Sequence, residues 1–264
     1  MNWIVIWGKK LFLVILLVII LLSFGSGFFM GNKYGKVVPV LNNRLVPIYR
    51  VDRNDKKIAI TLDGTWGAEY TEEILDILDE YNLKITFFFA GHWLEKYPEL
   101  VKEIARRGHE IGNHTYTHPH CNDLSRSQLE KELEDTSQLI EDLTGKRPRF
   151  FRPPFGEYNN RVIETAEELG YQVIQWSLDS LDWQEPGSNY IFERILEKVS
   201  SGDIILMHNN APDTPEALKK LIPKLNKQNY EIVPLSELVY KNNYSIQSHN
   251  GLQVKNQNRG EQYE

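Results

Sequence analysis

The stretch KIAITLDGTWGAEYTEEILDILDEY, residues 57–81, decides the fold of this chain. Residues 57–62 form an apolar run of strand length, and the acidic Asp63 follows it directly. From residue 71 onward, apolar residues recur at three- and four-residue spacing, which is typical of an amphipathic helix. A buried strand followed by an amphipathic helix is the repeating unit of folds that are built on a parallel sheet.

The same alternation continues through most of the chain. Strand-like runs recur at 85–90, 109–112, 150–151, 172–177, 203–207 and 231–233. Helix-like stretches lie between them at 98–107, 125–143, 160–169, 191–199 and 215–227. We therefore predict an α/β domain in which about seven parallel strands form a barrel with helices outside. An open, doubly wound sheet is the alternative.

Polar residues stand at the ends of five of these predicted strands. Asp63, His114, Arg152 and Asp179 each follow a strand, and His208 comes directly after another. In a barrel of parallel strands, the carboxyl ends of the strands form one rim, where catalytic groups converge. The sequence therefore predicts one shared site, whereas an open sheet would spread these groups along a crevice.

Two histidines in the run GNHTYTHP, residues 112–119, have the spacing of metal ligands. His114 and His118 are four residues apart, so a helical turn or a tight loop would place both imidazoles on one side of the backbone. Imidazole nitrogens bind zinc, cobalt and nickel. An isolated His-x-x-x-His is more often a hydrogen-bonded pair, but the polar residues at the other strand ends favour a metal site here.

The composition narrows the class of protein. With 264 residues and 41% hydrophobic residues, the chain suffices for one full-sized domain. The formal net charge is -6 and charges of both signs are interspersed, which argues against a nucleic-acid binder. Cys121 is the single cysteine of the chain, so there is no disulfide framework and no thiolate metal site. We expect a monomer.

The N-terminus has the pattern of a membrane segment. Two lysines at positions 9 and 10 precede an unbroken apolar run at 11–22, and uncharged residues extend it to position 30. About 20 such residues cross a bilayer as a helix, and the lysines favour a cytoplasmic N-terminus. We predict cytoplasmic residues 1–10 and a transmembrane anchor at 11–30, with the domain outside the cell. A cleaved signal peptide, giving a secreted domain, is the alternative.

The rest of the chain divides into three parts. We interpret residues 31–54 as a stalk and residues 55–241 as the catalytic domain. Residues 242–264 are polar and rich in Asn and Gln, which predicts a disordered tail.

Five segments together resemble the polysaccharide deacetylase family, carbohydrate esterase family 4, and the Asp63-x-x-Trp-Gly pattern resembles its sporulation-type members. The segments are Ile60-Thr-Leu-Asp63-Gly, His114-Thr-Tyr-Thr-His118-Pro, Arg152-Pro-Pro-Phe-Gly156, Asp179-Ser-Leu-Asp182-Trp183 and Leu206-Met-His208. The resemblance covers about residues 55–240. It implies a distorted (β/α) barrel that removes N- or O-acetyl groups from glycans such as peptidoglycan, chitin and xylan. The cofactor would be a divalent metal, zinc in the first place, with cobalt or nickel as alternatives.

The resemblance also implies the catalytic roles. Asp63 would be the base that takes a proton from water, and Arg152 would orient it. His208 would protonate the leaving group, held in its charged form by Asp182 or Asp179; the sequence leaves open which of the two does so.

The remaining predicted residues would bind substrate. The backbone N–H of Phe155 would help to hold the oxyanion, and Trp183 with Leu206 would line an apolar slot for the acetyl methyl group. Trp66 and Tyr116 are aromatic residues on rim loops and could stack on sugar rings.

One departure from the family pattern concerns Gly64. Family members usually carry two adjacent aspartates, of which the second binds the metal, and here a glycine stands in its place. The main hypothesis is a metal-dependent deacetylase of a cell-wall aminosugar, with peptidoglycan as the most favoured glycan. The alternative is a catalytically weakened glycan-binding protein on the same scaffold. An unrelated metal hydrolase fits poorly, because such sites are usually richer in carboxylates.

Overall fold

The structure is a computed structural model that describes residues 44–256. The predicted cytoplasmic segment 1–10, the anchor 11–30 and the first part of the stalk lie outside the described residues. Between residues 44 and 256, no helix is long and apolar enough to cross a membrane.

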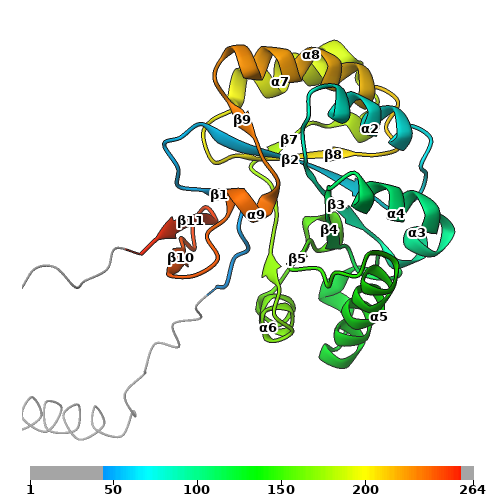
Figure 1. Ribbon diagram of the computed structural model, residues 1–264. Helices are drawn as coiled ribbons and strands as arrows, with labels where there is room; N and C mark the ends of the chain where they lie inside the picture. Colours follow the sequence, from blue (N-terminus) through cyan, green and yellow to red (C-terminus); the bar gives the residue numbers. More distant parts are fainter. Residues whose placement is uncertain (1–43, 257–264) are drawn as a thin grey trace, which may run out of the picture. The chain divides into compact units, whose positions relative to one another are not determined.

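A curled parallel sheet forms the centre of the domain (Figure 1). Its strands follow the order β6-β5-β4-β3-β2-β8-β7, and β9 also pairs with β2. All of these pairs are parallel. The bounds are β2 (Lys57–Gly64), β3 (Thr86–Phe89), β4 (Glu110–Asn113), β5 (Phe150–Phe151), β6 (Gln172–Val173), β7 (Leu178–Asp179), β8 (Ile204–His208) and β9 (Glu231–Ile232). The predicted α/β class and the parallel strands are confirmed.

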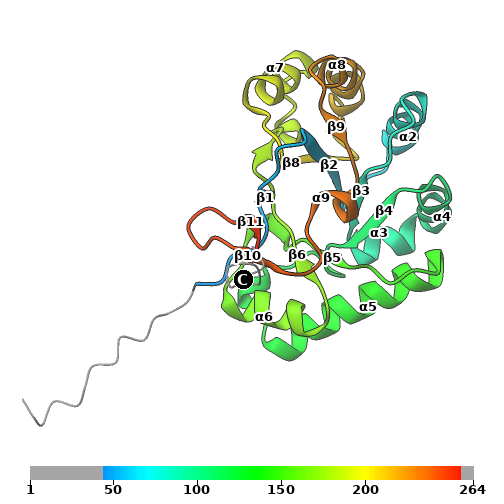
Figure 2. The same ribbon diagram turned by 60° about the vertical axis from the view of Figure 1, so that its left-hand side comes forward.

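Helices surround this sheet (Figure 2). They are α2 (Thr71–Glu80), α3 (Gly91–Lys96), α4 (Pro98–Arg106), α5 (Arg126–Thr144), α6 (Asn160–Glu168), α7 (Ser188–Lys198), α8 (Thr214–Lys227) and the short α9 (Leu235–Leu238). The longest of them, α5, begins with a capping box between Ser125 and Gln128 and ends at Gly145, which has a φ of 71°. The capping box is a typical helix-start signal and the glycine is a typical helix-stop signal, so the local sequence fixes the position of this helix.

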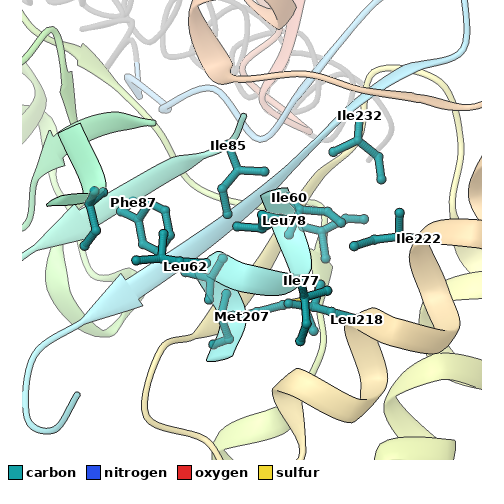
Figure 3. Packing of buried hydrophobic residues seen from close by; sticks show 14 of the residues in the cluster. Ile60, Leu62, Ile77, Leu78, Ile85, Phe87, Met207, Leu218, Ile222 and Ile232 are labelled. Atoms are coloured by element: carbon teal, nitrogen blue, oxygen red, sulfur yellow. The ribbon is translucent and has the colours of Figure 1, made fainter. Parts of the chain in front are cut away.

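Apolar side chains on the two faces of the sheet form separate clusters. On the outer face, Ile60 and Leu62 of β2 pack against α2 and α8 (Figure 3). On the inner face, Ala59 lies in a second cluster with Phe88 and Ile204. Successive residues of a strand point to opposite faces, so the strands are buried on both sides. The same alternation directs Thr61 and Asp63 towards the inside of the curled sheet.

The strand expected at 172–177 is shorter than predicted, and the reason lies in the N-terminal segment. Only Gln172–Val173 pairs with β5, and the chain then crosses to β7 beside β8. Ile48 fills this gap: its N–H donates to the carbonyl of Val173 at 2.9 Å, and its carbonyl accepts from Gln175 N at 2.8 Å. The sheet is thus an incomplete barrel whose seam is closed by residues preceding β2.

Two predictions about the ends of the domain are wrong. Residues 44–54 are not a free stalk, because Ile48 and Val51 are buried and β1 (Arg50–Val51) pairs with β11. Residues 242–255 are not a disordered tail, because β10 (Tyr244–Ile246) and β11 (Leu252–Lys255) form a three-stranded sheet with β1. Residues 257–264 lie outside the described part.

The polar composition of this C-terminal sheet conceals its packing. Gln253 is fully buried, and its side chain accepts from the N–H of Tyr240 and donates to the carbonyl of the same residue. A buried amide that makes both hydrogen bonds avoids the cost of an unsatisfied polar group. Polar residues can therefore build this sheet, although their composition alone predicts disorder.

Candidate active site

The polar residues at the carboxyl ends of the strands share one cavity of about 600 Å³. Ten of the twelve predicted site residues line it: Asp63, Trp66, His114, His118, Phe155, Asp179, Asp182, Trp183, Leu206 and His208. Arg152 lies beneath the cavity floor and contacts Asp63, whereas Tyr116 points elsewhere. The rim of the curled sheet therefore brings together residues that are up to about 145 positions apart in the chain, as the strand-end pattern indicates.

Asp63 is held from below by Arg152. Nη1 of the fully buried guanidinium donates to Oδ1 of Asp63 at 2.6 Å, and Nη2 donates to Thr61 Oγ1 at 2.9 Å. The guanidinium carbon lies 4.2 Å from the ring centroid of Phe88. One carboxylate oxygen of Asp63 is thus committed to Arg152. The other, Oδ2, faces Nε2 of His114 at 3.7 Å and is the oxygen that a water or an ion can reach.

His114 and His118 form a pair of neutral imidazoles. Their ring centroids are 4.9 Å apart. Nδ1 of His114 donates to the carbonyl of Arg152 at 2.7 Å, so the lone pair lies on Nε2. Burial lowers the pKa of His114, and burial together with the neighbouring His114 lowers the pKa of His118 to about 3. Neutral imidazole is the form that binds metal.

The two imidazoles belong to a tight loop, one of the two conformations that the sequence allows. Thr115 and His118 have φ values of 64° and 57°, in the left-handed region that β-branched and bulky side chains rarely occupy. Such a residue costs about 1–3 kcal/mol, so the surrounding structure must enforce it.

The donor set fits a divalent ion only in part. Within residues 44–256, no three His, Cys, Asp or Glu side chains are placed close enough together to make a complete metal site. However, Nδ1 of His118 is buried without a hydrogen-bond partner, and Nε2 of His114 is available. These two imidazole nitrogens fit a zinc-like ion whose other positions are taken by water or substrate.

On the opposite side of the cavity, His208 pairs with Asp182. Nδ1 of His208 lies 2.7 Å from Oδ1 of Asp182, and Oδ2 of this fully buried carboxylate also accepts from Thr214 Oγ1 at 2.6 Å. The choice between the two aspartates, open in the sequence, is thus resolved by the geometry. Asp179 accepts instead from the N–H of Leu181, and burial raises the pKa of Asp179.

The Asp182 carboxylate controls the protonation of His208. Burial by itself lowers the pKa of His208, but the hydrogen bond and the negative charge of Asp182 outweigh burial and raise this pKa above its ordinary value. The pKa of Asp182 is lowered, because its bonds to His208 and Thr214 outweigh the opposite effect of burial. His208 is therefore suited to donate a proton near neutral pH.

Three aromatic side chains stand exposed around the mouth of the cavity. Trp66, Phe155 and Trp183 have 66%, 55% and 57% of their surface exposed. The ring of Phe155 lies between two imidazoles, 4.6 Å from His118 and stacked at 4.4 Å on His120. Large exposed apolar side chains around a cavity mark a binding site.

Tyr116 does not belong to this group, which corrects one prediction. Its ring packs over Gly91, where an added Cβ would lie 2.3 Å from the Tyr116 ring. The Glu95 carboxylate, which accepts from its hydroxyl, and burial raise the pKa of Tyr116 to about 12. The Tyr116 side chain thus packs against α3 and does not line the cavity.

The chain is similar to known proteins in sequence and in fold. Residues 50–174 match the family described as polysaccharide deacetylase. A peptidoglycan-N-acetylglucosamine deacetylase of Bacillus cereus is 40% identical over 196 residues, which are 72% of this chain and 92% of that protein. The chain belongs to the polysaccharide deacetylase family.

Other similar proteins differ in what is said of their activity. An uncharacterised Bacillus subtilis protein is 36% identical over 193 residues, which are 73% of this chain and 60% of that protein. The crystal structure of a carbohydrate esterase family 4 pseudoenzyme from Bacillus anthracis has a TM-score of 0.71 at 36% identity. The match covers 73% of this chain and 68% of the pseudoenzyme chain. A mutant of that pseudoenzyme has restored enzymatic activity.

In this member of the polysaccharide deacetylase family, position 64 packs closely against the neighbouring strand. Gly64 is the last residue of β2, and its partner in the neighbouring strand is Phe89. A Cβ on Gly64 would lie 2.4 Å from Cε1 of Phe89 and 3.2 Å from Oδ1 of Asn209, on the face opposite to Asp63. Gly64 therefore supplies no ligand, as the sequence indicates, and a larger residue here would require the Phe89 ring to move.

Several supporting residues of the deacetylase site escape sequence reasoning. Thr61 and Thr214 bind Arg152 and Asp182 through their hydroxyl groups. Thr61 has a usable signal, because it lies two residues before Asp63 and so on the same face of the strand. Thr214 lies at the start of α8 and has no such signal. Trp176, which also lines the cavity, is hidden within a run predicted to be a strand.

Proposed function

We propose that the chain is a metal-dependent deacetylase that hydrolyses N-acetyl groups of a cell-wall glycan, with a peptidoglycan aminosugar as substrate. The observation that supports this most strongly is the arrangement of two separately held proton carriers in one cavity. Asp63 is fixed by Arg152 and keeps one oxygen free, while His208 is fixed by Asp182 on the other side. The names of several relatives support the choice of peptidoglycan.

The chain's own residues supply the proton transfers. Oδ2 of Asp63 accepts the proton of the water that attacks the acetyl carbonyl, and His208 donates its proton to the nitrogen that leaves. The products are acetate and a free amine on the sugar. A divalent ion held by His114 and His118 would lower the pKa of the attacking water and polarise the acetyl oxygen. Trp183 and Leu206 line the cavity where the acetyl methyl group would lie.

The mouth of the cavity suits a sugar chain. Trp66 and Trp183 offer exposed ring faces on which sugar rings can stack, and the rings of Trp66 and Phe155 both contact His118. The carboxylates that line the cavity, among them Asp179 and Glu185, disfavour a strongly anionic ligand such as a phosphate ester. A neutral N-acetylated glycan therefore fits better than the substrate of a phosphoesterase.

The alternative, a glycan-binding pseudoenzyme, has one supporting observation, which is the similarity to the Bacillus anthracis pseudoenzyme. Against it stand the two charged pairs. Arg152 and Asp182 are fully buried, and burying charged groups is unfavourable unless their partners remain. A scaffold that keeps both pairs has kept the base and the acid.

We further propose that the deacetylase acts as a monomer outside the cell, anchored by residues 11–30. The apolar run and the preceding lysines support an anchor, and peptidoglycan lies outside the membrane. Fractionation of cells that express the full chain would place it in the membrane pellet; recovery from the medium, shortened at its N-terminus, would instead indicate cleavage.

The deacetylase proposal can be tested with the purified full chain. Zinc or cobalt is added, and acetate release is measured from N-acetylglucosamine oligomers and from peptidoglycan. We expect release from the wild-type protein and almost none from H114A and D63N. Oligomer binding without acetate under any metal would favour the pseudoenzyme. Equal activity of wild type and both variants would contradict the assigned roles.

A further inference from the structure

The segment between the two imidazoles has little structure of its own. Residues 115–117 join His114 to His118, and both Thr115 and His118 adopt the left-handed conformation. Left to itself, such a segment would relax and move the imidazoles relative to one another. The contacts that hold it come from residues that do not line the cavity.

The strongest of these contacts come from Glu132 in the second turn of α5. Its Oε2 accepts from the backbone N–H groups of Tyr116 and Thr117, each at 2.8 Å. Its Oε1 accepts from Thr117 Oγ1 at 2.9 Å. Three hydrogen bonds from one half-buried carboxylate are charge-assisted and stronger than bonds between neutral groups.

The opposite side of the same segment is held by His92 of α3. Its backbone N–H donates to the carbonyl of Tyr116 at 3.1 Å, and its Nδ1 lies 2.9 Å from that carbonyl. Its Nε2 lies 2.7 Å from the carbonyl of Thr65, in the loop that follows Asp63. Tyr116 is therefore held at its N–H by Glu132 of α5 and at its carbonyl by His92 of α3.

Helix α5 is itself fixed relative to His114. The side-chain amide of Asn113, the residue before His114, donates from Nδ2 to the carbonyl of Leu133 at 2.8 Å. Leu133 follows Glu132 in the helix. Oδ1 of Asn113 accepts from the N–H of Thr115 at 2.8 Å. Glu132 and His114 thus belong to one rigid unit, so the carboxylate can impose a position on the loop.

We propose that Glu132 is the positioning residue that sets the separation of His114 and His118, and with it the affinity of the chain for a divalent ion. The inference rests on the proposed metal site. It assigns to α5 a function that neither the motif nor the cavity reveals, because Glu132 contacts neither imidazole and lies 14 residues from the second one. Residues that support metal ligands from behind typically change affinity 10–100-fold when they are lost.

The test compares three variants of the full chain. E132A removes all three hydrogen bonds. E132Q keeps them, because the amide oxygen can accept from both backbone N–H groups while the amide nitrogen donates to the Thr117 hydroxyl. E130A is the matched control, since Glu130 lies on the same helix and pairs with the exposed Arg126. The affinity for zinc is measured by competition with a chromophoric chelator, the cobalt site by its visible absorption, and stability by the Tm without metal.

We expect E132A to weaken zinc binding about 10–100-fold and to alter the cobalt spectrum, while E130A leaves both unchanged. E132Q should remain within a few-fold of the wild type. If Glu132 only stabilised the fold, E132A would lower the Tm without changing the zinc affinity of the folded protein. That result would overturn the role of Glu132 and leave the proposed function standing. If the wild-type protein binds neither ion, the proposed metal site fails, and the role of Glu132 fails with it.

Discussion

Asp182 holds His208 at two points: Oδ2 accepts from the backbone N–H and Oδ1 pairs with Nδ1, both at 2.7 Å. The ring can therefore neither rotate nor shift relative to the carboxylate. This double contact fixes Nδ1 as the inward-facing nitrogen, so Nε2 is the atom that can present a proton to the cavity.

Replacing Asp182 by Asn should move the alkaline limb of the pH–activity profile to lower pH. In the wild type, Asp182 raises the pKa of His208, so the protonated form and its stabilisation are fully present below about 6.5 and are lost as the pH rises through the raised value. In D182N, burial still lowers the pKa of His208, while the hydrogen bond and the charge of Asp182, which are the largest effects that raise it, are lost. A pH profile of kcat/KM, or an NMR titration of the His208 ring, would measure the shift; an unmoved alkaline limb would show that His208 is not the acid.

Replacing Arg152 by Lys should be severe in spite of the retained charge. Lysine cannot reproduce the planar fork that binds Asp63 and Thr61 together. A lysine that cannot reach both acceptors disrupts the buried pair, and complete loss of one partner would cost about 3–5 kcal/mol as an upper limit, so we expect a clearly lower midpoint in urea unfolding together with loss of acetate release. Exposed Arg126, which pairs with Glu168, provides the control: R126K should match the wild type in both measurements.

Introducing an aspartate at Gly64 should not strengthen metal binding. The new side chain would meet the Phe89 ring and Asn209, and overpacking of this kind costs about 1–3 kcal/mol. We therefore expect G64D to have a lower Tm and an unchanged or weaker affinity for zinc. A gain in zinc affinity at unchanged Tm would contradict the orientation of this residue in β2.

The C-terminal sheet should contribute measurably to stability. Replacing Gln253 by Ala leaves the N–H of the half-buried Tyr240 without a partner and leaves its carbonyl only the donor of Gln172, at a cost of about 1–3 kcal/mol. We expect a lower Tm for Q253A, while Q247A, at the exposed turn before β11, changes little. Equal Tm values for both variants would mean that the packing of β11 adds nothing to the domain.

Much of the fold was predictable because parallel strands are buried on both faces and therefore read as continuous apolar runs. The polar residues that follow these runs revealed the site for the same reason: Asp63, His114 and His208 had to share one rim. The seam at residues 174–177 was not predictable, because an apolar run carries no information about where one strand leaves a sheet and the next begins.

Other features of the site depend on direction, which a linear motif does not encode. Tyr116 lies between two metal-ligand candidates, yet its ring turns towards α3. The sequence does not distinguish Asp179 from Asp182 as the partner of His208, and only the geometry selects Asp182. Glu132 supports the histidine loop from a separate helix, so no spacing within the loop could identify it.

The strand conformation at Gly64 has a consequence for sorting relatives into active and inactive ones. A side chain at this position needs the Phe89 ring to move, so the residues at 64 and 89 have to be considered together. An aspartate at 64 is informative about activity only where the residue facing it on β3 leaves room for the carboxylate.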